Sequence, residues 1–163
     1  MKHMKSVSTI FLKLAIAALG TAVLAVCIFG LPAMWKAVPA EYPSHSYVFY
    51  AILSSFYIAA APFGVALYQA LRLLSYIDRN KAFSAASVAT LAWIAYCALA
   101  ISLVFTASSP FFYIWADNDD APGLMVISLF LIVAPLTISV FGLLLRRIFQ
   151  QALDLKSEND LTV

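Results

Sequence analysis

The chain has 163 residues, of which 64% are hydrophobic and only 11% are charged, and its formal net charge is +2. Soluble globular domains have about 45–50% apolar and about 25% charged residues, so this composition excludes an ordinary soluble domain and indicates a membrane protein. The small net charge gives no basis for direct nucleic acid binding through a basic face.

Four apolar runs are long enough to cross a membrane, whose hydrocarbon core of about 30 Å requires about 20 residues of helix. They cover approximately residues 9–31, 47–74, 88–108 and 123–145. The second run exceeds a single span, so we expect it to tilt or to project past the headgroups. The sequence predicts an all-α fold in which one domain, residues 1–163, forms an integral membrane bundle of four transmembrane helices.

The first run also resembles a signal peptide, because Lys2 and Lys5 precede it and Cys27 stands near a faint lipoprotein cleavage pattern. However, Val26 is large for the position before such a cysteine. The apolar run also continues to Leu31, which is too long for a typical signal sequence. We therefore interpret it as an uncleaved membrane span.

Basic residues are concentrated on one side of the predicted membrane. Nine of the ten Lys and Arg residues lie on that side, and Lys36 lies on the other. Because cytoplasmic segments carry the excess of Lys and Arg, this pattern predicts a multi-pass protein of the plasma membrane with both termini in the cytoplasm. The nine residues are Lys2, Lys5, Lys13, Arg72, Arg79, Lys81, Arg146, Arg147 and Lys156.

The two predicted outer loops contain aromatic residues that are typical of the headgroup zone. The second loop continues into the acidic stretch "ADNDDAPG". We expect these carboxylates to be solvated, since the ligand spacing of a known calcium loop is missing; cation binding is the alternative. The aromatic residues are Trp35, Tyr42 and Tyr47 in the first loop, and Phe111, Phe112, Tyr113 and Trp115 in the second.

The spans carry no constellation that points to catalysis. Lys13 lies near the inner surface, where its side chain can reach the headgroups, and no charge lies at mid-membrane. His3 and His45 lie on opposite sides of the predicted membrane. Cys27 and Cys97 lie inside apolar runs, where we interpret them as small apolar residues. We therefore expect no catalytic, cofactor-binding or metal-binding residues and no cofactor.

Proline and small residues shape the predicted helices. Pro62 and Pro135 lie near the middle of the second and fourth spans, where each removes an amide donor and is expected to kink its helix. Small residues recur at one-turn spacing, as at Ala98, Ser102 and Thr106. Such spacing lets helices approach closely, and it predicts either a compact bundle or a homo-oligomer.

A short charged segment, "SYIDRNKAFSAAS", separates the second and third spans. Asp78 suits the turn between two helices. Ser84 is a good N-cap for the third span, and Phe83 and Val88 have the spacing of a hydrophobic staple. The local physics therefore predicts a connector that ends in a helix start.

The tail, residues 146–163, is predicted to be a short amphipathic cytoplasmic extension. Ile148, Phe149, Ala152 and Leu155 follow at roughly helical spacing. An apolar face of this kind suits the membrane surface, a cytoplasmic partner or the neighbouring loop.

The charged segment and the tail together resemble the bacterial membrane family called domain of unknown function 2975. The resemblance implies four spans, no settled activity and no catalytic residue. Members of the family are similar to proteins often encoded beside small helix-turn-helix regulators, which implies such a regulator as a partner. The matching positions are Leu73, Leu74, Ile77, Phe83, Ser84, Val88, Leu91, Glu158, Asp160, Leu161, Thr162 and Val163.

We therefore expect a non-enzymatic regulator or sensor of the bacterial inner membrane, surrounded by the lipid bilayer and acting through a cytoplasmic partner. The alternative is a small oligomeric channel, exporter or transporter subunit in which Pro62 and Pro135 flex; a plain assembly subunit of a larger complex is a third reading. The predicted docking residues are Asp78, Arg79, Lys81, Phe83, Ser84, Glu158, Asp160, Leu161 and Thr162.

Overall fold

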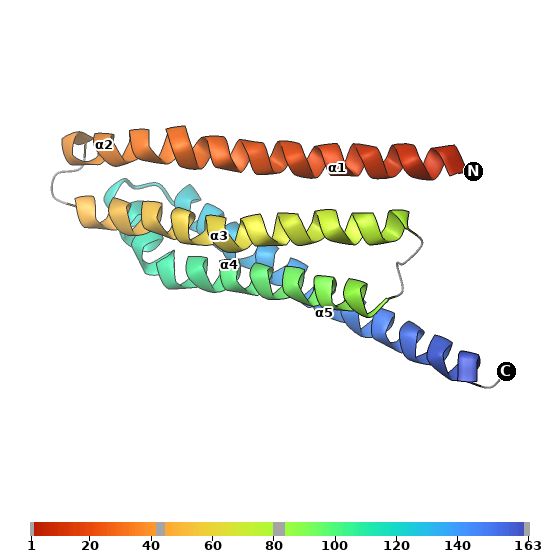
Figure 1. Cartoon of the computed structure of the whole chain (residues 1–163). Coiled ribbons are helices and arrows are strands. Elements are labelled where there is room, and N and C mark those ends of the chain that lie inside the picture. Colours follow the sequence, from red (N-terminus) through yellow and green to blue (C-terminus); the bar gives the residue numbers. More distant parts are fainter. Residues whose placement is uncertain (1, 42–44, 80–83, 162–163) are drawn as a thin grey trace.

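Six helical segments arranged as four long passes make up the described part of the chain, residues 2–41, 45–79 and 84–161 of a computed structural model. The start of the first pass, the end of the second, the start of the third and the end of the fourth all lie at one end of the molecule (Figure 1). The segments are α1 (Lys2–Ala25), η1 (Val26–Gly30), α2 (Leu31–Glu41), α3 (Ser46–Asp78), α4 (Ala85–Asn118) and α5 (Gly123–Leu161).

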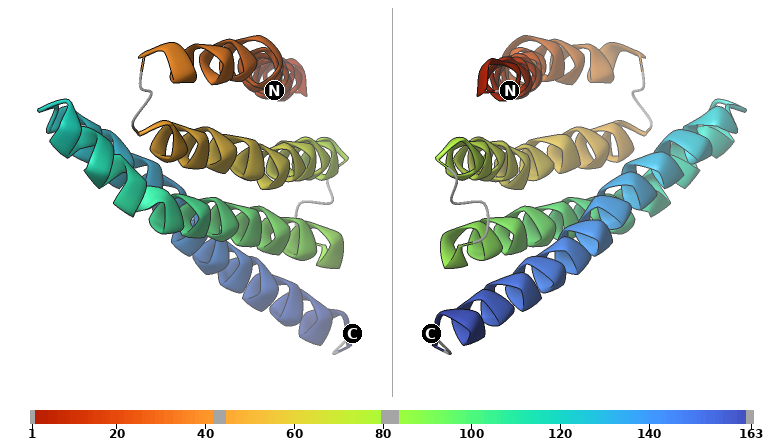
Figure 2. Two further views of the ribbon diagram at one scale, coloured as in Figure 1. Left: turned by 90° about the vertical axis from the view of Figure 1, so that its left-hand side faces the viewer. Right: turned by 90° about the vertical axis from the view of Figure 1, so that its right-hand side faces the viewer.

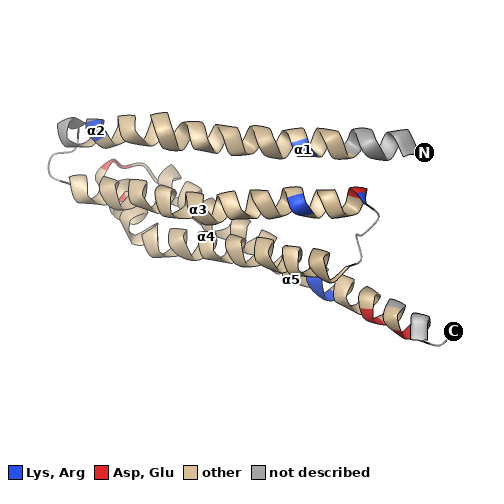
Figure 3. Cartoon of the chain, viewed as in Figure 1, with Lys and Arg blue, Asp and Glu red and all other residues tan. Residues whose placement is uncertain are grey.

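Within the described residues, four stretches are long and apolar enough to cross a membrane, which confirms the predicted all-α bundle. The first runs from Thr9 to Val38 through α1, η1 and α2, and the others lie on α3, α4 and α5. Charged residues gather toward the two ends of these passes, and uncharged residues fill the middle (Figure 3). We call the end that holds Lys13, Arg72 and Arg146 the basic end, and the end that holds Asp117 and Asp119 the acidic end.

The helices are longer on the acidic side than the predicted spans. The first span was predicted to end at Leu31, but the helix continues to Glu41, so Trp35 and Lys36 lie on a helix rather than in a loop. Likewise α4 continues past Ser108 and through Pro110 to Asn118. The reason is packing: Phe112 and Ala116, one turn apart, are 3% and 7% exposed, so burial sustains the helix beyond the proline.

α4 lies at the centre of the bundle, packed against α3 on one side and α5 on the other. The α4–α5 contact is close, because small residues meet there: Ala95 has no exposed surface, and a Cβ built on Gly142 would come within 3.0 Å of the Ala95 Cβ. Ser102 on α4 donates a 2.9 Å hydrogen bond to the Ile132 carbonyl on α5. The predicted close approach of helices at small residues is confirmed at this interface.

The first pass is the least buried of the four and contacts mainly α3. Both views in Figure 2 show it on the outside of the molecule, away from the C-terminal part of α5. Large apolar side chains such as Phe11 and Phe29 are more than 70% exposed on it. A membrane would cover this surface with lipid, where exposed apolar side chains cost nothing.

Candidate functional site

An ion pair joins the first pass to the end of α3 at the basic end. The Lys13 Nζ lies 2.5 Å from the Asp78 Oδ2, although the two residues are far apart in the chain. Their side chains are about one-third exposed. Asp78, predicted to suit a turn, is instead the last residue of α3, where its carboxylate pairs with Lys13 on α1.

The third span begins as predicted at a serine cap. Ser84 has an extended backbone, and its Oγ accepts a 3.3 Å hydrogen bond from the Ser87 N–H. Ser87 is fully buried and Val88 is 6% exposed, so the first turn of α4 is anchored in the bundle. Lys81 and Phe83, two predicted docking residues, lie outside the described residues, and so does the staple contact of Phe83.

Two arginines at the basic end contact tyrosine side chains. Arg72 on α3 donates a 2.9 Å hydrogen bond to the Tyr76 hydroxyl, and its guanidinium lies 5.8 Å from the ring centre of Tyr68. Arg146 on α5 donates a 3.2 Å hydrogen bond to the Tyr96 hydroxyl on α4. These contacts fix two cations at the level where each span leaves the apolar part of the bundle.

The predicted C-terminal extension is continuous with the fourth span. α5 has 39 residues, which corresponds to about 58 Å of helix, whereas the hydrocarbon core is about 30 Å thick. Its last turns diverge from α3 and α4 (Figures 1 and 2). Ile148 and Leu155, two turns apart on one face, are 50% and 67% exposed.

The predicted docking residues that the structure describes lie at the end of α3, at the start of α4 and on α5. Arg79 follows α3 and is exposed, and Ser84 precedes α4. Glu158 is exposed on the part of α5 that diverges from α3 and α4. Asp160 and Leu161 belong to α5 but their side chains are not described, and Thr162 lies outside the described residues.

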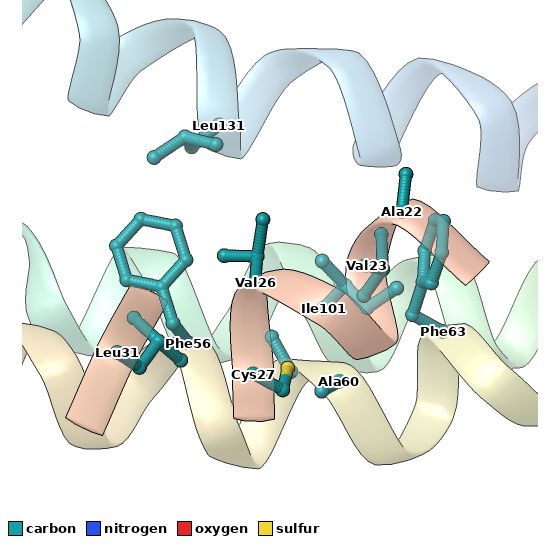
Figure 4. A pocket seen from close by; sticks show the side chains of 11 residues that line it. Ala22, Val23, Val26, Cys27, Leu31, Phe56, Ala60, Phe63, Ile101 and Leu131 are labelled. Atoms are coloured by element: carbon teal, nitrogen blue, oxygen red, sulfur yellow. The ribbon is translucent and has the colours of Figure 1, made fainter. Parts of the chain in front are cut away.

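An apolar cavity of about 390 Å³ lies where the first pass faces the other three. Side chains from every pass surround it, and all of them are apolar (Figure 4). A second cavity of about 470 Å³ continues toward the acidic end and shares part of this lining. The residues common to both cavities are Val26, Leu31 and Phe56.

A π-helical turn shapes the wall of these cavities. In η1 the Leu31 N–H bonds to the Val26 carbonyl, five residues back. If the same five-residue spacing continued, the Cys27 carbonyl would accept a hydrogen bond from the N–H of residue 32. Residue 32 is a proline, which has no N–H. Tyr57 on α3 supplies the donor instead, through a 3.0 Å hydrogen bond from its hydroxyl to the Cys27 oxygen.

Sequence reasoning missed both links between the first pass and α3. In the sequence, Tyr57 is one of several polar residues inside a span, and Lys13 is a cation near the inner surface. Pro32 was the available signal for the bond between Tyr57 and Cys27. Once the helix is known to continue past Leu31, a proline inside it predicts an unpaired carbonyl about one turn earlier.

At the acidic end the aromatic residues divide into two groups. Phe112 is buried, and the ring of Trp115 packs edge-on to Phe49 with 4.8 Å between ring centres. Tyr113 is 60% exposed, as the headgroup zone requires. The Trp115 Nε1 donates a 2.8 Å hydrogen bond to the Asp119 Oδ2, so that carboxylate closes the end of α4.

Comparison with known proteins places the chain in a family. The family model described as "Protein of unknown function (DUF2975)" matches residues 33–163. The chain is 48% identical over 160 residues to the "Uncharacterized membrane protein YoaS" of Bacillus subtilis (strain 168), which covers 98% of this chain and 100% of that protein. No solved structure matches the chain. The protein therefore belongs to the DUF2975 family of membrane proteins.

Proposed function

We propose that the protein is a non-enzymatic regulator or sensor of the bacterial inner membrane that acts through a cytoplasmic partner. Its basic end and both termini face the cytoplasm in this proposal. A small helix-turn-helix transcription regulator is the kind of partner that the resemblance implies. The observation that carries the proposal is the continuous helix α5, which extends beyond the bundle and presents apolar side chains there.

The distribution of charge supports this orientation. Lys13, Arg72 and Arg146 lie at the basic end, and the carboxylates Asp117 and Asp119 lie at the other (Figure 3). The positive-inside rule then directs the basic end toward the cytoplasm.

The C-terminal part of α5 supports a docking role. Ile148 and Leu155 are seven residues apart, so they lie on one face of the helix, and Ala152 lies between them. An amphipathic helix that lays its apolar face into a groove of another protein is a common mode of recognition. Because α5 is one unbroken helix from Gly123, a shift of its membrane part moves this face directly.

The apolar cavities support a signal that arrives from within the membrane. They lie between the first pass, which is the least buried of the four, and the other three passes. An apolar compound that fills this space would change how the first pass sits on α3. Such a change reaches the basic end through the Lys13–Asp78 pair.

Crosslinking of the intact protein in its own membrane, followed by purification, tests the docking role. The full chain should bring down a cytoplasmic protein, and deletion of Glu158 to Val163 should abolish its recovery. Ile148→Ser should also reduce recovery, whereas the control Gln150→Ser should not, because Gln150 lies about 200° around the helix from Ile148. Equal recovery with all four proteins would refute a role for the tail.

The competing function as an oligomeric channel, exporter or transporter subunit predicts flux across reconstituted vesicles. Ion flux that is lost in a Pro62→Ala, Pro135→Ala double variant would support that alternative and count against the regulator. Vesicles without flux, together with a captured partner, would support the regulator.

A further inference from the structure

A groove on the outer side of the first pass differs from the two apolar cavities described above, because it combines apolar walls with a cation. It lies between α2 and α3 near the acidic end and has a volume of about 470 Å³. The residues that line it are Pro32, Trp35, Lys36, Ser54, Tyr57 and Ile58.

Lys36 places a positive charge at the level of the lipid headgroups. It comes 23 residues after Lys13, which corresponds to about 35 Å of helix and therefore to the opposite face of a hydrocarbon core about 30 Å thick. Its side chain is exposed, and none of the described residues that line the groove is acidic. It is also the one basic residue that the sequence assigns to the acidic end.

The rest of the groove is suited to a hydrocarbon chain. Pro32 lies one turn from Lys36 toward the middle of the membrane, and Ile58 on α3 is 59% exposed. The Trp35 ring is steadied by the Tyr50 ring, with 4.7 Å between their centres. The two hydroxyls of the lining already bond to backbone carbonyls: Ser54 to Ala51 and Tyr57 to Cys27.

We propose that this groove binds an anionic phospholipid of the adjacent leaflet. The phosphate of the lipid contacts the Lys36 ammonium, and one acyl chain lies along Pro32 and Ile58. A lipid with a single negative charge, such as phosphatidylglycerol, fits better than phosphatidylcholine, since the choline cation of the latter offsets the attraction between its phosphate and Lys36.

Quenching of Trp35 fluorescence by brominated lipids tests the proposal. The full chain with Trp93→Phe and Trp115→Phe leaves Trp35 as the single tryptophan. It is reconstituted in phosphatidylcholine vesicles that contain small amounts of phosphatidylglycerol or phosphatidylcholine brominated near the glycerol end of the acyl chains. We expect the apparent affinity of the quenching site to be about fivefold higher for phosphatidylglycerol, from the contribution of one lysine near a lipid surface.

Two variants with the same loss of charge separate a site from general attraction. Lys36→Gln should abolish the preference for phosphatidylglycerol, and Arg147→Gln, at the basic end, should preserve it. Circular dichroism checks that each variant is folded. Inorganic phosphate should not compete, since the groove binds the acyl chain as well as the phosphate.

Several outcomes would overturn the proposal. Equal quenching by the two lipids would show that Lys36 selects no headgroup. Loss of the preference in both variants would show attraction by net charge alone. Competition by inorganic phosphate would point to a soluble ligand, and absence of quenching by either lipid would show that the groove is covered, as by a second copy of the chain.

Discussion

The hydroxyl of Tyr57 on α3 lies 3.0 Å from the carbonyl oxygen of Cys27 in the π-helical turn of the first pass. The pair joins two helices at a place where the backbone of one of them lacks a donor, because Pro32 cannot supply it. In a membrane no water is available to replace the bond, so an unpaired carbonyl there is costly. The least buried helix of the bundle is thus attached by a bond that its own proline makes necessary.

Replacing Tyr57 with phenylalanine should destabilise the bundle by about 1 kcal/mol, the order found for hydrogen bonds between membrane helices. The ring and its packing are retained, so the loss measures the hydroxyl alone. Unfolding of the purified protein in mixed micelles with increasing denaturing detergent gives the free energy. Tyr113→Phe, on an exposed side chain of α4, is the control and should have no measurable effect.

The same bond should matter less when Pro32 is absent. Pro32→Ala restores a backbone N–H beside η1, which gives the Cys27 carbonyl a second source of a donor. In that background Tyr57→Phe should cost less than it does in the natural chain. An equal cost in both backgrounds would contradict the explanation that Tyr57 compensates for the proline.

The Lys13–Asp78 pair should control how firmly the N-terminal half of the first pass is held. Because both side chains are partly exposed, the attraction is screened by salt, and the effect on global stability should be small. We expect Asp78→Asn to increase amide hydrogen exchange in α1, and high salt to do the same to the unchanged protein. Asp154→Asn, on the extension of α5, is the matched control and should leave α1 unchanged.

The number of spans and the cap at Ser84 could be predicted from the sequence because each depends on a local pattern. A run of about 20 apolar residues is sufficient to define a membrane helix. A serine before an apolar run is sufficient to define a cap, and the Ser84 Oγ indeed accepts from Ser87. Both rules need no knowledge of the neighbouring helices.

The contacts of the first pass could not be predicted, because they depend on register between helices that are distant in the chain. Nothing in the residues around Lys13 indicates that Asp78 comes to lie beside it. The length of α4 could not be predicted for a related reason: the burial of Phe112 sustains the helix beyond Pro110, and that burial depends on neighbouring helices. The positions of Pro62 and Pro135 inside helices were correct, and the predicted kinks stay predictions.

The close approach of α4 and α5 predicts opposite effects of the same substitution at two glycines. Gly142→Ala places a methyl group 3.0 Å from the Cβ of Ala95, which has no rotamer to relieve the contact, so we expect a loss of about 1 kcal/mol or more. Gly64→Ala meets nothing within 4 Å and should be neutral, or stabilising by up to about 1 kcal/mol through helix propensity. Detergent unfolding of the two variants measures this difference, and equal stabilities would contradict it.

The hydrogen bond from Ser102 to the Ile132 carbonyl should help to hold α4 against α5 close to Pro135. Ile132 lies three residues before Pro135, where the proline ring disturbs the backbone and pushes neighbouring carbonyls away from the helix axis. Ser102→Ala should therefore cost about 0.5–1.5 kcal/mol in detergent unfolding. Thr137→Ala is the control: Thr137 bonds to the Val133 carbonyl of its own helix, so its loss should leave the α4–α5 contact intact. If the two variants were equally stable, the Ser102 bond would not contribute to holding the helices together.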